Sequence, residues 1–360
     1  MPINYSDREI SLTQKYELFS PPSLNVGIKT FGFGKSNSGW SGGVLAPNGK
    51  IYGIPQGNTI LEIDPLVGTA TTFSCSVTVS YVGGVVAKNG KIYCNSNTGN
   101  KVLEIDPISR NSTEISFING AFSGNNAILS TNGKIYFSPK GTRVGIYNPI
   151  TKSDSFITVS GLNGFNNCGT LAPNGKIYCI SSNGGPLKIL VIDPSDDTTS
   201  TISTTISSDY DSWRSAVLAQ NGKIYGIPQS STSILEIDTI AGTATTFGNV
   251  LGSAPTGNQS FGGRDGGVLG GDGKIYAAPQ GSEAFNSGIK LLVIDPIQKT
   301  LNYVDIPYIY PVSTWIGGVL APNGKIYFIP SSNNGFILEV GETTTTKPAN
   351  SLLSPYMNVY

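Results

Sequence analysis

Residues 42–55 read Gly-Gly-Val-Leu-Ala-Pro-Asn-Gly-Lys-Ile-Tyr-Gly-Ile-Pro, and they open a unit that recurs seven times along the 360-residue chain. Every copy places a lysine directly after a glycine, and in all but one copy that glycine follows an asparagine. These turn lysines recur at intervals of 41 to 51 residues and are Lys50, Lys91, Lys134, Lys176, Lys223, Lys274 and Lys325. A repeat of this length indicates a modular fold in which neighbouring copies share one core.

Each unit contains four short β-rich segments, which we label strands A to D in chain order. Asn-Gly between the first two segments predicts a tight type I′ hairpin, whose central residues both need positive φ. In the first copy, strand C covers Ile60–Asp64 and ends at Pro65, because proline cannot continue a hydrogen-bonded ladder. Strand D follows at Thr69–Phe73. This pattern predicts an all-β fold, a seven-bladed β-propeller with four antiparallel strands per blade.

The last repeat ends with a strand C at Phe336–Val340 and has no evident fourth strand. Ahead of the first repeat, Gly27–Gly32 resembles strand D of the other copies. We therefore expect this N-terminal strand to close the last blade, which removes the open edge of the ring. The expected organisation is an N-terminal tail at 1–26, a seven-bladed propeller at 27–341 and a C-terminal tail at 342–360.

The composition excludes several classes of partner. Lysine plus arginine and aspartate plus glutamate number 23 each, so no net field attracts nucleic acid. No apolar run is long enough for membrane insertion, and the N-terminal residues lack the features of a signal peptide. Only 13% of the residues are charged. A polar, uncharged surface favours an extracellular or virion-surface location, although it does not fix the compartment.

The repeated charges are interpreted as structural. In five blades the turn lysine faces an aspartate at the end of strand C, which predicts cross-strand ion pairs such as Lys50 with Asp64. Blades three and seven lack this aspartate, so Lys134 and Lys325 are expected to be less compensated. A glutamate two residues earlier in four blades predicts hydrogen bonds between blades to the repeated tyrosines.

The quoted segment, followed by Leu-Glu-Ile-Asp-Pro and Thr-Ala-Thr-Thr-Phe, resembles the repeats of YVTN-type and NHL-type propellers and of the virginiamycin B lyases. The resemblance covers about residues 27–341, and its motifs specify a blade and not a reaction. Likeness to the lyases implies histidines beside a metal, but the chain contains no histidine.

Likeness to lactonase-type propellers implies calcium held in the channel by inner-strand carboxylates and amides. The corresponding positions here offer no carboxylate and are Gly42, Gly83, Asn126, Cys168, Ser215, Gly266 and Gly317. No phosphate-binding loop, Cys-x-x-Cys motif or activated nucleophile is evident either. We therefore expect no metal, no cofactor, no catalytic residue and no enzymatic activity. The alternative is a propeller enzyme of lactonase or lyase type with a channel-bound divalent metal.

Function is expected where the repeats differ. Two adjacent variable positions, eight and seven residues before the turn asparagine, are expected to ring one mouth of the channel. Aromatic and arginine side chains there carry binding energy, since they offer large rigid area and hydrogen bonds. The predicted rim consists of Trp40, Tyr81, Asn125, Asn166, Trp213, Arg214, Arg264, Asp265 and Trp315. The alternative is that the tryptophans pack between blades.

The sequence thus predicts a non-catalytic binding or structural module that recognises a glycan or a protein partner at this rim. We expect it to be displayed on a cell or virion surface, with its tails anchoring it in a larger assembly or virus particle, as in host attachment.

Overall fold

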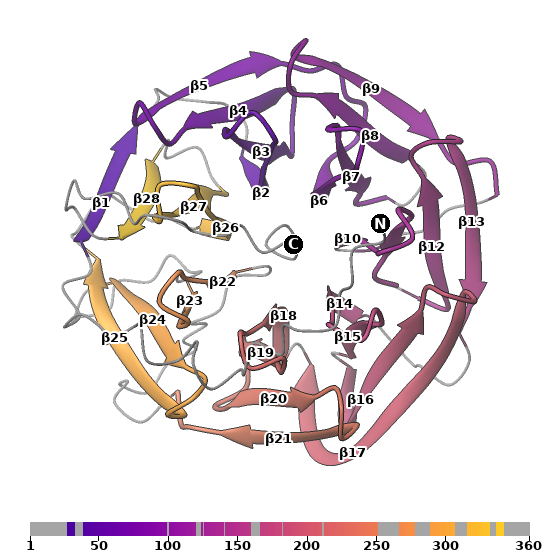
Figure 1. Cartoon of the computed structure of the whole chain (residues 1–360), viewed down its shortest axis with the longest axis vertical. Helices are drawn as coiled ribbons and strands as arrows, with labels where there is room; N and C mark the ends of the chain where they lie inside the picture. The colour runs from indigo at the N-terminus through magenta and orange to yellow at the C-terminus, as the bar shows by residue number, and fades with distance from the viewer. Residues whose placement is uncertain are drawn as a thin grey trace, which may run out of the picture.

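The computed structural model describes residues 27–32, 39–98, 101–119, 124, 126–139, 141–159, 166–181, 183–210, 212–250, 266–277, 289–306, 315–331 and 336–341. Over these ranges the chain forms seven four-stranded sheets arranged as a ring around a central opening (Figure 1). The predicted all-β, seven-bladed propeller is therefore confirmed. A helix long and apolar enough to cross a membrane is not found in the described ranges.

Each blade is an antiparallel meander with strand A nearest the central opening. The strands of blades one to four, from A to D, are β2 (Trp40–Leu45), β3 (Ile51–Pro55), β4 (Thr59–Asp64) and β5 (Thr69–Ser74); β6 (Tyr81–Val86), β7 (Ile92–Ser96), β8 (Lys101–Asp106) and β9 (Asn111–Ser116); β10 (Ala127–Leu129), β11 (Ile135–Phe137), β12 (Arg143–Asn148) and β13 (Ser153–Thr158); β14 (Asn166–Leu171), β15 (Ile177–Ser181), β16 (Asn183–Asp193) and β17 (Thr198–Tyr210). The strands of blades five to seven are β18 (Trp213–Leu218), β19 (Ile224–Pro228), β20 (Ile234–Asp238) and β21 (Thr243–Phe247); β22 (Gly267–Leu269), β23 (Ile275–Ala277), β24 (Ile289–Asp295) and β25 (Thr300–Ile306); β26 (Trp315–Leu320), β27 (Ile326–Pro330), β28 (Phe336–Gly341) and β1 (Gly27–Gly32).

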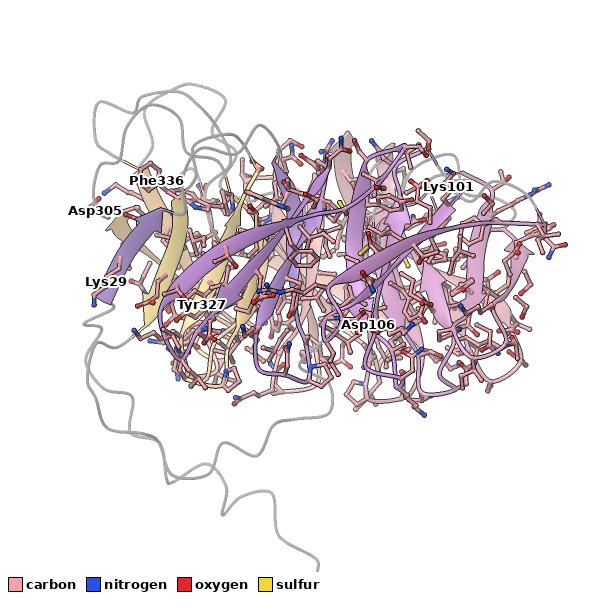
Figure 2. The ribbon with its side chains drawn as sticks, turned by 90° about the horizontal axis from the view of Figure 1, so that it is seen from above. Lys29, Lys101, Asp106, Asp305, Tyr327 and Phe336 are labelled. Carbon is pink, nitrogen blue, oxygen red and sulfur yellow. The ribbon has the colours of Figure 1, made fainter. Side chains whose placement is uncertain are left out.

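The direction of the strands gives the ring two different faces. Strands A and C run toward the face that carries the A–B and C–D turns, which we name the turn face. Strands B and D run toward the face that carries the B–C and D–A connections, which we name the loop face. In the side view of Figure 2, Lys101 and Phe336 start their C strands near the loop face, and Asp106 ends its C strand near the turn face.

The A–B turn differs in type from the expected one. Across it, Ala46 N–H donates to the Lys50 carbonyl at 2.9 Å, and Gly49 N–H donates to the Ala46 carbonyl at 3.0 Å. Gly49 has a φ of 79°, whereas Asn48 does not have positive φ. This is a three-residue turn of type I with its last residue left-handed, in which Pro47 fixes the negative φ of the first position. Asn48 supports it by accepting a hydrogen bond from Lys50 N–H at 3.1 Å.

Neighbouring blades approach each other most closely along the A strands. A Cβ atom on Gly43 of β2 would lie 2.8 Å from the Ile329 side chain of blade seven, and one on Gly84 of β6 would lie 2.7 Å from Ile54 of blade one. Both distances are shorter than a carbon contact, so a larger residue at either position would displace the neighbouring isoleucine side chain. Apolar side chains fill the space between adjacent sheets, as Ile54 and Cys94 do between blades one and two.

The N-terminal strand β1 completes blade seven, as predicted. All six residues of β1 pair with β28, from Gly27 opposite Gly341 to Gly32 opposite Phe336. Blade seven therefore has no C–D turn, and the chain enters and leaves the ring at one place on the turn face. The tails expected at 1–26 and 342–360 lie outside the described residues.

Candidate functional site

A pocket opens at the centre of the ring, among the A strands of six blades. It contains about 410 Å³ of empty space, including the part that is open to solvent. We name it the channel pocket, and its lining residues are Ser41, Gly42, Gly43, Gly83, Gly84, Asn126, Cys168, Ser215, Ala216, Gly317 and Gly318. All of these residues are uncharged.

The channel pocket has two chemically different halves, because one position of the repeat carries different residues in different blades. Blades seven, one and two place glycine there, with φ values of 63°, 79° and 58° at Gly317, Gly42 and Gly83. A Cβ atom on Gly42 would meet no atom within 4 Å, so this side of the pocket is open. Blades three, four and five place Asn126, Cys168 and Ser215 at the same position. One half thus consists of glycine backbone with the hydroxyl group of Ser41, and the other presents an amide, a thiol and a hydroxyl group.

The polar half is held in place by hydrogen bonds between blades. Asn126 Nδ2 donates to the Gly169 carbonyl of blade four at 3.0 Å, and Asn126 Oδ1 accepts from Ala127 N–H at 2.9 Å. Ser215 Oγ accepts from Gly267 N–H of blade six at 3.2 Å, so its hydroxyl hydrogen can still be donated. These side chains are therefore fixed before any ligand arrives, which lowers the entropic cost of binding.

The lining does not fit a metal ion of the kind that the resemblance of the repeats implies. Calcium and magnesium bind through carboxylate oxygens, and zinc binds through imidazole, thiolate or carboxylate groups. The channel pocket offers one amide, one thiol and two serine hydroxyls. Within the described ranges, no group of three His, Cys, Asp or Glu side chains is placed to hold a metal ion.

The tryptophans of the predicted rim are packing residues, so the rim prediction is corrected for them. Trp40, Trp213 and Trp315 are at most 1% exposed. Their indole N–H groups donate to backbone carbonyls near the start of strand C in the same blade, at Thr59, Ser233 and Phe336, over 2.9, 2.8 and 3.1 Å. The indoles turn inward because the space between sheets is wide enough for them beside small residues. A Cβ atom on Gly53 would lie 3.1 Å from the Trp40 ring.

Tyr81 is buried in the same way, and its role is structural. Its hydroxyl donates to Glu114 Oε1 at 2.9 Å. Glu114 also binds Lys101 Nζ at 2.6 Å and Thr78 N–H at 2.8 Å. Burial alone would raise the pKa of the Glu114 carboxyl, but hydrogen bonds from Lys101, Thr78 and Tyr81 outweigh it and lower the pKa to about 2. This cluster fixes the connection between blades one and two.

The remaining predicted rim residues are only partly described. Arg214 lies in β18 and is half-buried beside the channel-lining Ser215. Asn166 lies in β14, but its side chain is outside the described set. Asn125, Arg264 and Asp265 are outside the described residues. Arg214 is therefore the one predicted rim side chain that the described part of the chain places at the surface near the pocket.

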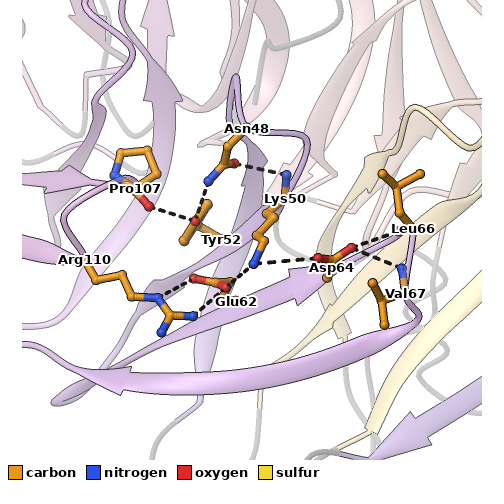
Figure 3. Close-up of polar contacts among 9 residues, drawn as sticks. All are labelled: Asn48, Lys50, Tyr52, Glu62, Asp64, Leu66, Val67, Pro107 and Arg110. Atoms are coloured by element: carbon orange, nitrogen blue, oxygen red, sulfur yellow. Dashed lines mark hydrogen bonds and ion pairs between the residues drawn. The ribbon is translucent and has the colours of Figure 1, made fainter.

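The repeated charges of the turn face bind one another (Figure 3). The Glu62 side chain is 4% exposed and accepts hydrogen bonds from Lys50 Nζ at 2.8 Å and from Arg110 Nη2 and Nε of blade two at 2.7 and 3.0 Å. Burial alone would raise the pKa of the Glu62 carboxyl, but Arg110 and Lys50 outweigh it and lower the pKa. Tyr52 adds a hydrogen bond to the Pro107 carbonyl of blade two at 3.1 Å. Arg110 and Tyr52 thus join blades one and two, whereas the contact of Lys50 with Glu62 lies within blade one.

We name the contact of Arg110 with Glu62 an inter-blade latch. It starts from the last residue of the C–D turn, which has a left-handed φ of 57° at Arg110. In three other blades the residue at the same turn position forms an ion pair with the preceding blade. These pairs are Lys152 with Glu104 at 3.8 Å, Asp197 with Lys134 at 2.7 Å and Lys299 with Glu236 at 3.1 Å. At Asp197 the charges are exchanged, so that the turn residue is the anion and the preceding blade supplies the cation, Lys134. Blade three offers no glutamate for a cationic turn residue, because it carries Ile146 where blades one, two and five carry glutamate. Glycine occupies the latch position in blades one and five, at Gly68 and Gly242.

Some expectations about these charges were wrong. Lys134 and Lys325 are not less compensated than the others, because they bind Asp197 at 2.7 Å and Glu339 at 2.6 Å. The tyrosine–glutamate hydrogen bonds form within one blade and not between blades, as for Tyr93 and Glu104 at 2.8 Å. The expected lysine–aspartate pairs form in blades one, four and five, at 3.7, 2.9 and 3.3 Å for Lys50–Asp64, Lys176–Asp193 and Lys223–Asp238.

Sequence reasoning missed the latches, although a signal for them exists. Arg110 follows a blade that carries Glu62, whereas Gly242 follows blade four, which carries Val191 at the glutamate position. The residue at the end of the C–D turn therefore matches strand C of the preceding blade in blades two, three, five and six, but not in blade one, where Gly68 follows Glu339 of blade seven. The sequence does indicate that the position of Asn126 and Ser215 faces the channel, where the lack of carboxylates argues against calcium but leaves hydrogen-bonding groups for another ligand.

No protein-family model and no curated protein sequence matches the chain. Among solved structures, it is similar to a catalytically inactive virginiamycin B lyase from Staphylococcus aureus with quinupristin, with a TM-score of 0.72 and 14% identity over 88% of this chain and 99% of that one. A streptogramin B lyase matches with a TM-score of 0.70 and 15% identity over 88% and 97%. The extracellular domain of a putative one-component system from B. thetaiotaomicron matches with a TM-score of 0.65 and 13% identity over 86% and 40%.

These comparisons show the fold of the chain, a seven-bladed propeller like that of virginiamycin B lyase, in agreement with the resemblance of its repeats. They also correct the expectation that the chain is not an enzyme. Three of the matched structures are of lyases, and the likeness extends over nearly their whole length. The chain has no histidine, and many of its carboxylates bind lysines at repeated positions of the blades. Neither observation therefore excludes catalysis by this propeller.

Proposed function

We propose that the chain is a ligand-binding propeller and that its ligand is a small, neutral, polyhydroxylated molecule of the carbohydrate class, held in the channel pocket. The observation that carries this proposal is the uncharged, two-sided lining of the pocket. A charged ligand would lose its hydration there without gaining a partner of opposite charge. A sugar can instead exchange hydrogen bonds with Ser215, Asn126 and backbone groups, while its ring lies over the glycine half.

The A strands support this role because hydrogen bonds join them to the next blade beside the pocket. Asn126 and Ser215 are each tied to the next blade by a hydrogen bond of 3.0 and 3.2 Å. Pockets with fixed polar groups and open apolar or backbone surface are the usual form of small-molecule sites. We assign Arg214, which is half-buried next to Ser215, to contact with a longer ligand that extends toward the loop face.

A pair of matched variants tests the proposal. Gly42 and Gly68 have φ values of 79° and 74°, and neither would bring a Cβ atom within 4 Å of another atom. Asparagine tolerates this backbone conformation better than most residues, so Gly42→Asn and Gly68→Asn make the same chemical change with similar strain. Only Gly42→Asn places its side chain in the channel pocket.

The assay is a glycan array combined with thermal shift against a panel of neutral mono- and oligosaccharides. We expect at least one sugar to bind the unmodified chain and Gly68→Asn alike, and to bind Gly42→Asn at least about tenfold more weakly, a loss of about 1.4 kcal/mol. Equal binding by all three proteins, or no bound sugar in the panel, would overturn the assignment. Mass spectrometry of the recovered sugar shows in the same assay whether the ligand is converted.

Display on a cell or virion surface belongs to the same proposal and is supported by composition, since only 13% of residues are charged. Purification from the native source tests it. Co-purification with a particle or an envelope fraction is the expected result, and recovery as a free protein would contradict it.

A further inference from the structure

The turn face carries a repeated set of exposed aliphatic side chains that the channel pocket does not use. Five of the C–D turns place leucine or isoleucine at the same position, with exposures of 59% to 96%. We name this set the aliphatic ring, and it consists of Leu66, Ile108, Ile150, Ile240 and Ile297. Single exposed apolar residues are ordinary, but here an exposed leucine or isoleucine recurs at the same position in five of the repeats.

These side chains are held in fixed positions. The backbone N–H of each residue donates to the aspartate or asparagine side chain two residues earlier, at 2.9 to 3.1 Å. Where a latch is present, an ion pair also holds the end of the turn. Arg110, in the same turn as Ile108, binds Glu62 of blade one in this way. The aliphatic ring is therefore presented on a rigid support, which reduces the entropy lost on docking.

We infer that the aliphatic ring is a docking surface and that its occupant is the segment 348–360 of this same chain. That segment has no charged residue and contains six large apolar side chains: Leu352, Leu353, Tyr356, Met357, Val359 and Tyr360. Its neutrality suits a surface on which the charges already pair with one another, as Lys50, Glu62 and Arg110 do. The inference concerns the turn face and is independent of the ligand proposed for the channel pocket.

The topology brings this segment to the correct face. Strand β28 ends at Gly341 on the turn face, paired with Gly27, where the other blades have a C–D turn. Leu352 follows eleven residues later, so it can lie up to about 36 Å from Gly341. Blade one, which carries Leu66, is the direct neighbour of blade seven around the ring (Figure 1). A segment that leaves the ring here therefore reaches the nearest members of the aliphatic ring without crossing the channel.

Site-specific photo-crosslinking in the full chain tests the inference. A photoreactive phenylalanine analogue replaces Val67, an exposed residue beside Leu66, and leaves the aliphatic ring itself unchanged. At low micromolar concentration we expect a crosslink to the peptide that contains residues 348–360, in a product with the mass of one chain. Absence of this crosslink would overturn the inference. The same crosslink in a product of two chains would also overturn it and would identify a second copy as the occupant.

Substitutions in the same chain show whether the contact is specific. Leu352→Ser with Leu353→Ser should reduce the crosslink about tenfold or more, and so should Ile108→Ser with Leu66→Ser. Ile118→Ser is the matched control, because Ile118 is 85% exposed but does not belong to the aliphatic ring. Loss of the crosslink in the control, or its persistence in both double variants, would contradict the proposed contact. Binding of sugars by the channel pocket should be the same in all of these variants.

Discussion

Replacing Glu62 by glutamine should destabilise the propeller by about 2 kcal/mol. The substitution keeps the shape of the side chain but removes the charge that binds Lys50 and Arg110 at 2.8 and 2.7 Å. Removing one partner of a buried ion pair costs about 3–5 kcal/mol, but here both cations are partly in water, with side-chain exposures of 33% and 51%. Solvent screening therefore reduces the expected cost by about half. In a domain of this size, about 2 kcal/mol corresponds to a fall in Tm of about 3 °C.

The repeat supplies a matched control for this experiment. Glu339 of blade seven binds Lys325 at 2.6 Å, but blade one has Gly68 at the latch position. Glu339→Gln should therefore cost about 1 kcal/mol, because only one charge-assisted hydrogen bond is lost. Equilibrium unfolding in urea measures both variants, and a double-mutant cycle of Glu62→Gln with Arg110→Ala isolates the latch. Equal costs at Glu62 and Glu339, or a coupling energy below about 0.3 kcal/mol, would refute the latch as a stabilising contact.

The dependence on pH follows from the same carboxyl group. Its pKa is lowered in the folded state from an ordinary value of 4.5. A lowered pKa stabilises the folded chain above the unfolded value and loses that contribution as pH falls through the folded value. The difference in stability between the unmodified chain and Glu62→Gln should thus be full at pH 7 and shrink below about pH 4.5. A difference that stays constant down to pH 3 would contradict the assignment.

Two further predictions concern the core. Trp213→Ala should cost about 3–5 kcal/mol in urea unfolding, because the indole is fully buried and bound to the Ser233 carbonyl, and a cost below about 1 kcal/mol would contradict its packing role. All four cysteines are buried as free thiols, and burial raises the pKa of Cys75 to about 11 and that of Cys179 to about 12, so a thiol-reactive dye at pH 8 should label none in the folded chain and all four in urea. One rapidly labelled thiol would contradict this.

The fold could be predicted from the sequence because its signals are local and repeated. The glycine at Gly49 marks a left-handed turn position, Pro65 ends a strand, and Gly27–Gly32 has the pattern of the strand that blade seven lacks. The direction of the tryptophan side chains could not be predicted in this way. Whether Trp40 points to the channel or between the sheets depends on the space beside Gly53, which exists only once the blades are packed.

Some of the charge contacts could likewise be predicted from the sequence, and others could not. Lys50 and Asp64 lie opposite each other on neighbouring strands, so counting residues from the loop predicted them. The contact of Arg110 with Glu62 joins residues 48 positions apart in different blades, and it depends on how far each blade is rotated against the next. The reversal at Asp197 likewise becomes visible only when blades three and four are seen side by side.

The pairing of β1 with β28 has a consequence for the order of folding. During synthesis on the ribosome, Ile28 emerges more than three hundred residues before Val340, the residue that it faces in the finished ring. The blades between them can form and stack as they appear, because each is a meander of neighbouring strands. The first strand must wait unpaired until the last blade is translated. The join that seals the circle is therefore also the last to be made.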